Sequence, residues 1–138
     1  MPDVRVLVVD DEPDIRATVS AMLEIEGYEV TEAANGAEAL HEIEDRAPDV
    51  ILLDMRMPVL DGWGFAAELR RRGHRTPIVV MTAARDAAHW ASEIAAAAFV
   101  AKPFGFDDLI AAVEQVSTQE LTKPQVATVD PPSQPGPP

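Results

Sequence analysis

The chain contains no cysteine, and its 11 lysines and arginines are outnumbered by 24 aspartates and glutamates. The lack of cysteine excludes disulfide bonds, thiol catalysis and thiolate-ligated zinc. The formal net charge of −13 argues against a nucleic-acid groove or an anionic membrane surface, because both require excess positive charge on the protein. This charge balance favours cation binding or basic protein partners instead.

Long hydrophobic runs are also missing. The longest is far below the roughly 18 residues of a membrane-spanning helix, and the opening Met1-Pro2-Asp3 lacks the basic and then apolar pattern of a signal peptide. Hydrophobic residues still make up 47% of the 138 residues, which is enough for one core but not for two independent ones. We therefore expect a small, acidic, soluble, cytoplasmic domain with no nucleic-acid or membrane partner.

The composition changes near the end of the chain. Apolar clusters recur up to Val116 and then give way to proline, glutamine, serine and threonine. Because proline lacks a backbone donor and fixes φ, we expect a folded domain over residues 1–117 and a proline-rich tail, disordered or in polyproline-II conformation, over residues 118–138. Pro132-Ser-Gln-Pro135 matches the PxxP pattern of ligands for aromatic grooves, although an unpatterned solvated tail is the favoured interpretation.

Strand-like and helix-like patterns alternate before that tail. Short apolar runs suited to buried strands occupy Val4–Val9, Tyr28–Ala33, Val50–Leu53, Pro77–Met81 and Ala98–Ala101. Apolar residues at helical spacing predict helices that run from Pro13 to near Gly27, around Ala39–Ile43, around Phe65–Leu69, weakly over Asp86–Ile94, and over Leu109–Val116. This order predicts an α/β fold, (βα)5, in which a doubly wound parallel five-stranded sheet carries helices on both faces.

Residues that can do chemistry follow four of the five expected strands. Ligands of open parallel sheets bind beyond the carboxyl ends of the strands, and those ends carry Asp10-Asp11-Glu12, Asp54, Thr82 and Lys102-Pro103. A desolvated carboxylate beside another shifts its pKa or recruits a cation. Asp11 and Asp54 would form an all-oxygen site that suits Mg²⁺ or Mn²⁺ rather than zinc. Taken alone, Asp10 and Asp11 could instead cap the following helix.

These motifs together resemble the receiver domain of bacterial two-component response regulators. The resemblance rests on Val8-Val9-Asp10-Asp11-Glu12-Pro13, Asp54-Met-Arg-Met-Pro58 with Asp61-Gly62, Met81-Thr82-Ala83, and Lys102-Pro103-Phe104. Each motif alone is weakly specific, but all four in order, each at the end of its strand, form a highly specific pattern. The resemblance covers Val4 to about Val116 and implies the flavodoxin-like strand order 2-1-3-4-5.

The resemblance implies a phospho-acceptor and a metal site. Asp54 would take a phosphoryl group from the phosphohistidine of a sensor histidine kinase or phosphotransfer protein. Asp11 would ligate Mg²⁺ (or Mn²⁺) directly and Asp10 through water, with Asp54 and the backbone carbonyl of Arg56 completing the protein ligands. Such a protein is not an enzyme but a phospho-acceptor that promotes its own phosphorylation and dephosphorylation.

The resemblance also implies a switch. The Lys102 ammonium, the Thr82 hydroxyl and the Ala83 backbone amide would contact the phosphoryl oxygens. Thr82 would turn toward the phosphoryl group, Phe99 would swing into the vacated space, and the face formed by the fourth helix, fifth strand and fifth helix would change for a partner protein. Family structures have a cis bond at the position of Lys102-Pro103.

Three departures from the family pattern concern this output face. The stretch between Thr82 and Lys102, which holds the fourth helix, is slightly shorter than is usual in the family. The Gly-Ala that commonly precedes the fifth strand is replaced within Ala95–Ala98, and the usual glycine after Pro58 is replaced by Val59. Because glycine adopts positive φ without strain, we expect an altered end of the fourth helix.

Two other functions compete with the switch. One is an interaction module with the receiver fold that binds partners independently of phosphorylation. The other is a small phosphatase that forms an aspartyl phosphate, which is disfavoured because the Asp-x-Asp pattern and a cap domain are missing. The kinase, the downstream target, and the choice between a monomer and a phosphorylation-linked dimer stay open.

Overall fold

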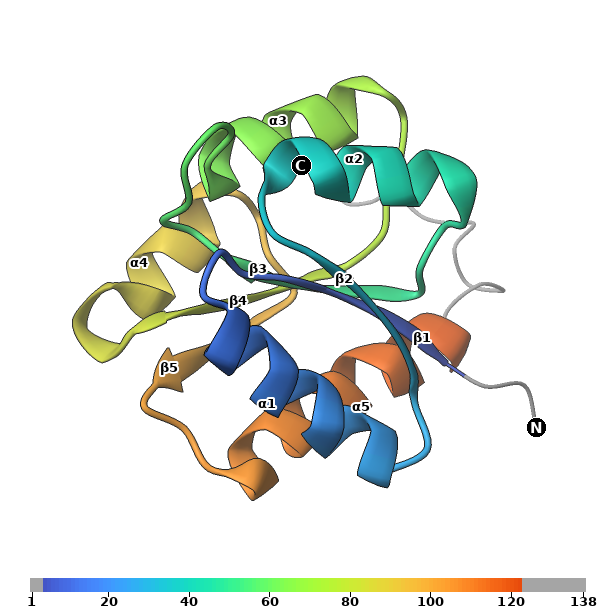
Figure 1. The fold of residues 1–138 in the computed structure, drawn as a ribbon, viewed down its shortest axis with the longest axis vertical. Coiled ribbons are helices and arrows are strands. Elements are labelled where there is room, and N and C mark those ends of the chain that lie inside the picture. Colours follow the sequence, from blue (N-terminus) through green and yellow to red (C-terminus); the bar gives the residue numbers. More distant parts are fainter. Residues whose placement is uncertain (1–3, 123–138) are drawn as a thin grey trace, which may run out of the picture.

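The computed structural model describes residues 4–122, in which five strands and five helices alternate strictly (Figure 1). The strands are β1 (Arg5–Val9), β2 (Glu29–Ala33), β3 (Val50–Asp54), β4 (Ile78–Ala83) and β5 (Ala98–Lys102). The helices are α1 (Pro13–Ile25), α2 (Gly36–Asp45), α3 (Gly62–Arg71), α4 (Ala84–Glu93) and α5 (Phe106–Thr122). The PxxP pattern of the tail lies outside the described residues.

All five strands are parallel and follow the order β2-β1-β3-β4-β5, which confirms the expected fold class. The chain moves outward from β1 to β2 and then returns to place β3 on the other side of β1. The strand order therefore reverses between β1 and β3, the position at which ligands bind in folds of this type. Val9 pairs with Leu53 there, so the residues that follow each of them emerge side by side.

Helices cover both faces of the sheet, with α1 and α5 on one face and α2, α3 and α4 on the other (Figure 1). The β3 strand shows why its sequence is apolar throughout. Ile51 and Leu53 point into the core under α2 and α3, whereas Val50 and Leu52 point into the core under α1 and α5. A strand buried on both faces has no solvent side, so polar residues are excluded from it until its end.

Several element boundaries differ from the sequence prediction, and the larger differences involve β4, α4 and α5. The β4 strand runs to Ala83 and passes directly into α4, which starts at Ala84 rather than Asp86. Residues 118–122, assigned above to the tail, continue α5. They can do so because no proline occurs before Pro124 and because glutamine, glutamate and leucine favour helix.

Both positions that lack the expected glycine adopt positive φ. Val59 has φ 71° and Ala95 has φ 53°, whereas the ends of α1 and α3 use Gly27 and Gly73 for the same kind of turn. Left-handed backbone costs a non-glycine residue about 1–3 kcal/mol. The end of α4 therefore keeps the left-handed turn that glycine provides after α1 and α3, and Ala95 bears the strain; the altered helix end expected from the sequence is not seen in the backbone.

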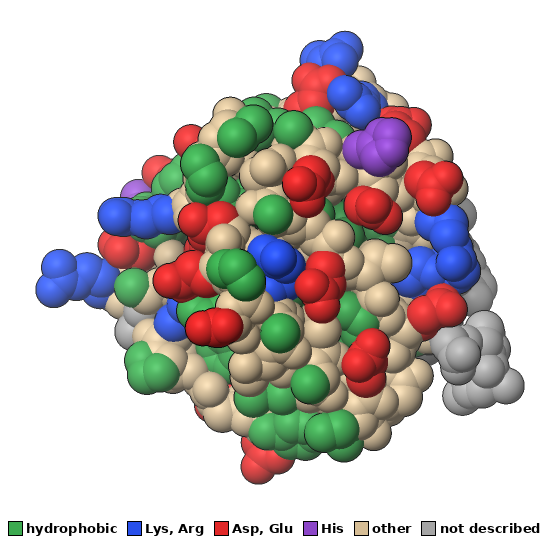
Figure 2. All heavy atoms as spheres, in the orientation of Figure 1, with side chains coloured by type: hydrophobic (Ala, Val, Ile, Leu, Met, Phe, Trp, Pro, Cys, Tyr) green, Lys and Arg blue, Asp and Glu red, His purple; other side chains and the backbone are tan. Residues whose placement is uncertain are grey.

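Acidic side chains are scattered over the face seen in Figure 2, and most basic side chains lie toward its rim. This distribution agrees with the net charge of −13. Among the described helices, none is long and apolar enough to cross a membrane.

Candidate functional site

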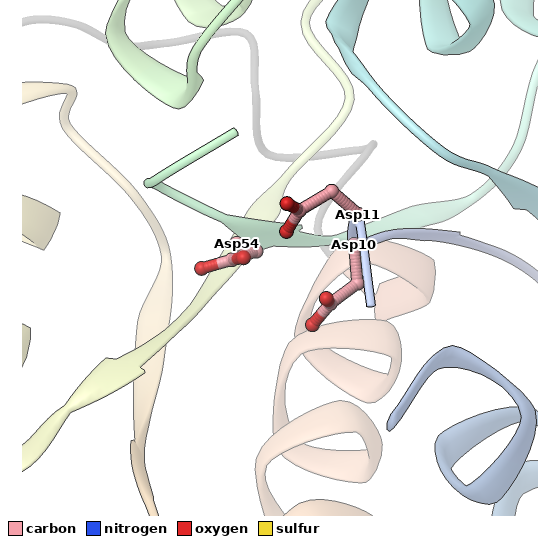
Figure 3. A group of neighbouring side chains, drawn as sticks. All are labelled: Asp10, Asp11 and Asp54. Atoms are coloured by element: carbon pink, nitrogen blue, oxygen red, sulfur yellow. The ribbon is translucent and has the colours of Figure 1, made fainter. Parts of the chain in front are cut away.

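Three carboxylates meet at the edge of the sheet where the strands end, here called the carboxyl edge. Asp10 follows β1, Asp11 is the next residue, and Asp54 ends β3 (Figure 3). One oxygen from each of the three side chains lies within 4.8 Å of the others. Asp10 is completely buried and Asp54 is 6% exposed, so two of these charges are largely withdrawn from water.

Lys102, at the end of β5, brings a positive charge to the same point. Its Nζ lies 3.3 Å from Oδ2 of Asp10 and 3.8 Å from Oδ1 of Asp54. The peptide bond that follows it, Lys102–Pro103, is cis, as the resemblance implied. One ammonium thus contacts two of the three carboxylates, and the four side chains together keep a negative charge.

The pKa of Asp54 reflects that balance. Burial raises the pKa of the Asp54 carboxyl to about 6, the Lys102 ammonium opposes the rise, and the neighbouring Asp10 and Asp11 carboxylates add to it. The backbone N–H of Arg56, 3.4 Å from Oδ1, lowers the pKa slightly. A carboxylate that resists ionisation beside two others gains most from a nearby cation.

The donors present fit a hard divalent cation. All three side chains offer carboxylate oxygen, the ligand preferred by Mg²⁺ and Mn²⁺ but not by zinc or softer metals. Oδ1 of Asp10 accepts the backbone N–H of Glu12 at 2.9 Å, and its Oδ2 faces Lys102. Because both oxygens of Asp10 have protein partners, the direct ligands would come from Asp11 and Asp54.

A cavity of about 430 Å³ opens over this cluster. It is lined by Asp11, Glu12, Asp54, Arg56, Thr82, Ala83, Asp86 and Lys102. A water molecule in the liquid takes up about 30 Å³, so the cavity has room for a hydrated cation together with a small anionic group. The carboxyl ends of β3, β4 and β5 and the residues that follow β1 all contribute to it, as the parallel topology requires.

Most of the residues predicted from sequence therefore gather in one place, and Phe99 lies apart from them. Thr82 is buried at 4% exposure, whereas Phe99 is 47% exposed and lines a separate cavity of about 400 Å³ beside α5. Phe99 pairs with Val80 of β4, two residues before Thr82. The two proposed switch residues thus stand on neighbouring strands, with the aromatic ring directed outward.

Sequence reasoning missed two groups of residues around the site. Asp86 lines the cavity because α4 begins directly after β4, which places the first turn of α4 beside the site. The second group is an aromatic stack. The Arg56 guanidinium lies 5.1 Å from the centre of the Trp90 ring, which packs edge-on against Trp63 at 4.9 Å.

A hydrogen bond also joins α3 to α4 beside this aromatic stack: Nε1–H of Trp63 donates to Oε1 of Glu93 at 2.8 Å. Both tryptophan rings are partly buried against the core under α2 and α3. No pattern in the sequence could have shown the contact between Arg56 and Trp90, because it depends on how α4 packs on the loop after β3.

The fold is therefore that of a doubly wound α/β protein. Its acidic cluster, whose donors fit a divalent cation, lies where the strand order reverses. The family model of the response regulator receiver domain matches residues 6–114, and the chain belongs to that family. Receiver domains act as phospho-acceptors rather than as conventional enzymes, and response regulators receive phosphate from histidine kinases. The family binds Mg²⁺ at an acidic pocket.

Curated relatives share this part of their sequence. The chain is 36% identical over 124 residues to the regulatory protein AtoC of Escherichia coli, an overlap that covers 88% of this chain and 27% of that protein. It is 42% identical over 113 residues to the transcriptional regulatory protein PdtaR of Mycobacterium tuberculosis, with 80% of this chain and 55% of that protein covered. The chain thus spans about a quarter to a half of these relatives.

Solved structures show the same fold. The chain is similar to NtrX from Brucella abortus, with a TM-score of 0.84 and 32% identity over 91% of this chain and 29% of that one. It is also similar to the chemotaxis protein CheY4 of Vibrio cholerae, with a TM-score of 0.76, 33% identity, and coverage of 83% of this chain and 99% of that one.

Proposed function

We propose that the chain is a phosphorylation-dependent switch of a two-component system or phosphorelay, with Asp54 as the phospho-acceptor. The donor would be the phosphohistidine of a sensor histidine kinase or of a phosphotransfer protein. The observation that carries the proposal is the convergence of Asp11, Asp54 and Lys102 at one cavity of about 430 Å³, with the buried Asp10 carboxylate beside them.

The metal-binding residues follow from the donor set. Asp11, Asp54 and the backbone carbonyl of Arg56 would hold Mg²⁺, or Mn²⁺, with Asp10 acting through a water molecule. When bound, the cation supplies positive charge to the phosphoryl oxygens and lets Asp54 stay ionised at neutral pH.

The transfer step needs an ionised, well-placed Asp54. One carboxylate oxygen forms a bond to phosphorus while the bond from phosphorus to the imidazole nitrogen breaks. The departing nitrogen keeps the electron pair, so the donor histidine returns to its neutral form after taking up a proton from solvent. The Lys102 ammonium, the Thr82 hydroxyl and the Ala83 N–H line the cavity where they can stabilise the equatorial oxygens.

The product is an acyl phosphate, which hydrolyses readily. Attack of water on phosphorus would release inorganic phosphate and restore the Asp54 carboxylate, so the domain would promote its own dephosphorylation as well as its phosphorylation. A signal that decays at its own site suits a resettable switch.

The output is proposed to pass from Thr82 to Phe99. A phosphoryl group on Asp54 would attract the Thr82 hydroxyl, and the space left beside β5 would admit the Phe99 ring, which is now 47% exposed. The face formed by α4, β5 and α5 would then present a different surface to a downstream protein or to a second copy of the chain.

Intact-mass measurement tests the phospho-acceptor directly. Wild-type protein incubated with Mg²⁺ and acetyl phosphate should gain the mass of one phosphoryl group, whereas Asp54→Ala and a magnesium-free sample should gain none. Asp49→Asn is the matched control, because Asp49 is a carboxylate at the opposite edge of the sheet that accepts the backbone N–H of Arg5. An unmodified but folded wild type, or equal modification of Asp54→Ala, would contradict the proposal.

A second candidate is an interaction module that works without phosphorylation. The strained Ala95 at the end of α4, in place of the family's glycine, motivates it, because this residue borders the proposed output face. Partner capture with and without a beryllofluoride mimic distinguishes the two functions. Capture that ignores both the mimic and Asp54→Ala supports the module, and capture that requires them supports the switch.

A further inference from the structure

Arg16 of α1 makes two contacts that the proposed function does not use. Its Nη1 donates a hydrogen bond to the backbone carbonyl oxygen of Asp10 at 2.7 Å, and its Nε donates to Oε1 of Glu32 on β2 at 3.2 Å. The Arg16 side chain is only 18% exposed. A long, charged side chain is therefore held in one conformation against the loop that carries the acidic pair.

The carbonyl that Arg16 contacts lies just beyond the last paired residue of β1. The strand pairing between β1 and β2 ends at Val9 and Ala33, and the N–H of Asp10 then donates to the carbonyl of Ala33 at 3.2 Å. The next peptide, which joins Asp10 to Asp11, leaves the sheet to enter α1. Arg16 thus supplies the hydrogen-bond partner for this peptide that a strand would otherwise provide.

This peptide sets the direction of both side chains. A turn of this peptide plane would move the Asp10 and Asp11 carboxylates relative to the Asp54 carboxylate. At present one oxygen of each of the three lies within 4.8 Å of the others. Outer groups that orient metal ligands commonly change metal affinity by about 10- to 100-fold when they are removed. We infer that Arg16, oriented by Glu32, is a positioning residue that holds the Asp10–Asp11 peptide in the geometry needed to bind a divalent cation.

The inference rests on the proposed metal site. Whether replacing Arg16 weakens or tightens cation binding distinguishes a positioning role from simple electrostatics. Removing a positive charge near three carboxylates should tighten cation binding if charge alone matters. Removing a positioning group should weaken cation binding. A merely structural role for Arg16 would lower stability without changing the affinity of the folded protein.

Mn²⁺ titration followed by electron paramagnetic resonance provides the measurement, with Mg²⁺ added as competitor. We expect Arg16→Met to raise the Kd for Mn²⁺ about 10-fold, and Arg16→Lys to raise it less, because lysine keeps the charge and one donor. Arg5→Met is the matched control: Arg5 begins the same strand and pairs with Glu29 at the opposite edge. This control should bind Mn²⁺ as wild type does or slightly more tightly.

Circular dichroism and urea unfolding show which variants are folded at the titration temperature. If Arg16→Met does not fold, Arg16→Lys carries the test, with a weakening of about 3-fold expected. A wild type that binds Mn²⁺ with the folded Arg16 variants equal to it or tighter would overturn the role of Arg16 alone. A wild type that binds no Mn²⁺ at millimolar concentration would overturn both this role and the proposed metal site.

Discussion

The two edges of the sheet handle charge in opposite ways. At the edge where the strands begin, here called the amino edge, acids and bases are paired: Arg5 contacts Glu29 at 2.9 Å, and Arg72 contacts Glu68 at 2.8 Å. At the carboxyl edge, the Asp10, Asp11 and Asp54 carboxylates cluster together, and the Lys102 ammonium contacts two of them, Asp10 and Asp54. The first arrangement is balanced and exposed, and the second is unbalanced and largely buried.

This difference shows where the fold accepts an unfavourable arrangement. Exposed ion pairs contribute about 0–1 kcal/mol each, so the amino edge could change with little effect. Burial at the carboxyl edge raises the pKa of Asp54 to about 6, so the ionised site destabilises the fold unless a cation balances it. Perturbed groups of this kind are typical of functional sites.

The largest expected effect comes from removing the positively charged Lys102 side chain at the carboxyl edge. Lys102→Met should lower the initial rate of phosphorylation by acetyl phosphate by about 100-fold or more, because one stabiliser of the equatorial oxygens is lost. Arg5→Met removes a cation from the balanced edge and should leave the rate within about 2-fold. Intact mass against time measures both, and equal rates for the two variants would abolish the contrast between the edges.

The stability of Asp54→Asn sharpens the comparison through pH. An acid whose pKa is raised by folding stabilises the protein below its unfolded value of 3.8, and that stability is lost as pH rises toward about 6. In the absence of divalent cations, Asp54→Asn should therefore be more stable than wild type by about 2 kcal/mol near pH 7.5 and equal to it near pH 4.

Urea unfolding at several pH values gives this difference, with Asp49→Asn as the control from the amino edge. Millimolar Mg²⁺ should raise the stability of wild type and narrow the gap. If Asp54→Asn is no more stable than wild type at neutral pH, the ionised acidic cluster does not lower the free energy of unfolding.

Backbone strain gives a smaller effect and also contrasts the edges. Val59, in the loop at the carboxyl edge, has φ 71° and is 80% exposed, so Val59→Gly removes strain without losing packing. We expect a gain of about 1 kcal/mol. Ala95→Gly, at the amino edge, should gain less, because alanine is not β-branched.

The converse substitution is the control. Gly27→Ala places a side chain at φ 94°, where a Cβ would meet no atom within 4 Å, so only backbone strain changes. It should lose about 1 kcal/mol. Urea midpoints for the three variants decide the matter, and a loss of stability in Val59→Gly would mean that the valine side chain has a packing or docking role.

The smallest effect is expected at the balanced edge itself. Arg71 and Arg72 hold the pKa of Glu68 at about 2, yet these groups lie at the surface, where solvent screens the pairing. This kind of pairing is lost only as pH falls through that value. Glu68→Gln should leave the urea midpoint at neutral pH unchanged within error, and a clear loss there would show that the amino edge is not dispensable.

Much of this contrast could be predicted from the sequence. The apolar run Val50–Leu53 implied a strand buried on both faces, and parallel topology then required Asp54 to emerge beside the residues that follow Val9. The acidic site depends on strand ends and register, which local pattern encodes well. The resemblance to receiver domains supplied the strand order.

The remainder depended on contacts between distant elements. Arg16 donates to the Asp10 carbonyl, and Arg56 packs on Trp90. Both contacts follow from how α1 and α4 lie on the sheet, which the periodicity of apolar residues in the sequence does not predict. The extension of α5 through residues 118–122 was missed because the later prolines dominated the composition of that segment.

Chemical trapping of the phosphorylated residue tests the central claim most directly. Borohydride reduces an aspartyl phosphate to homoserine, and peptide mass spectrometry locates the change. After incubation with Mg²⁺ and acetyl phosphate, the account predicts homoserine at position 54 and at no other aspartate. Homoserine at Asp10 or Asp11 instead, or none at all in a folded and magnesium-loaded protein, would contradict it.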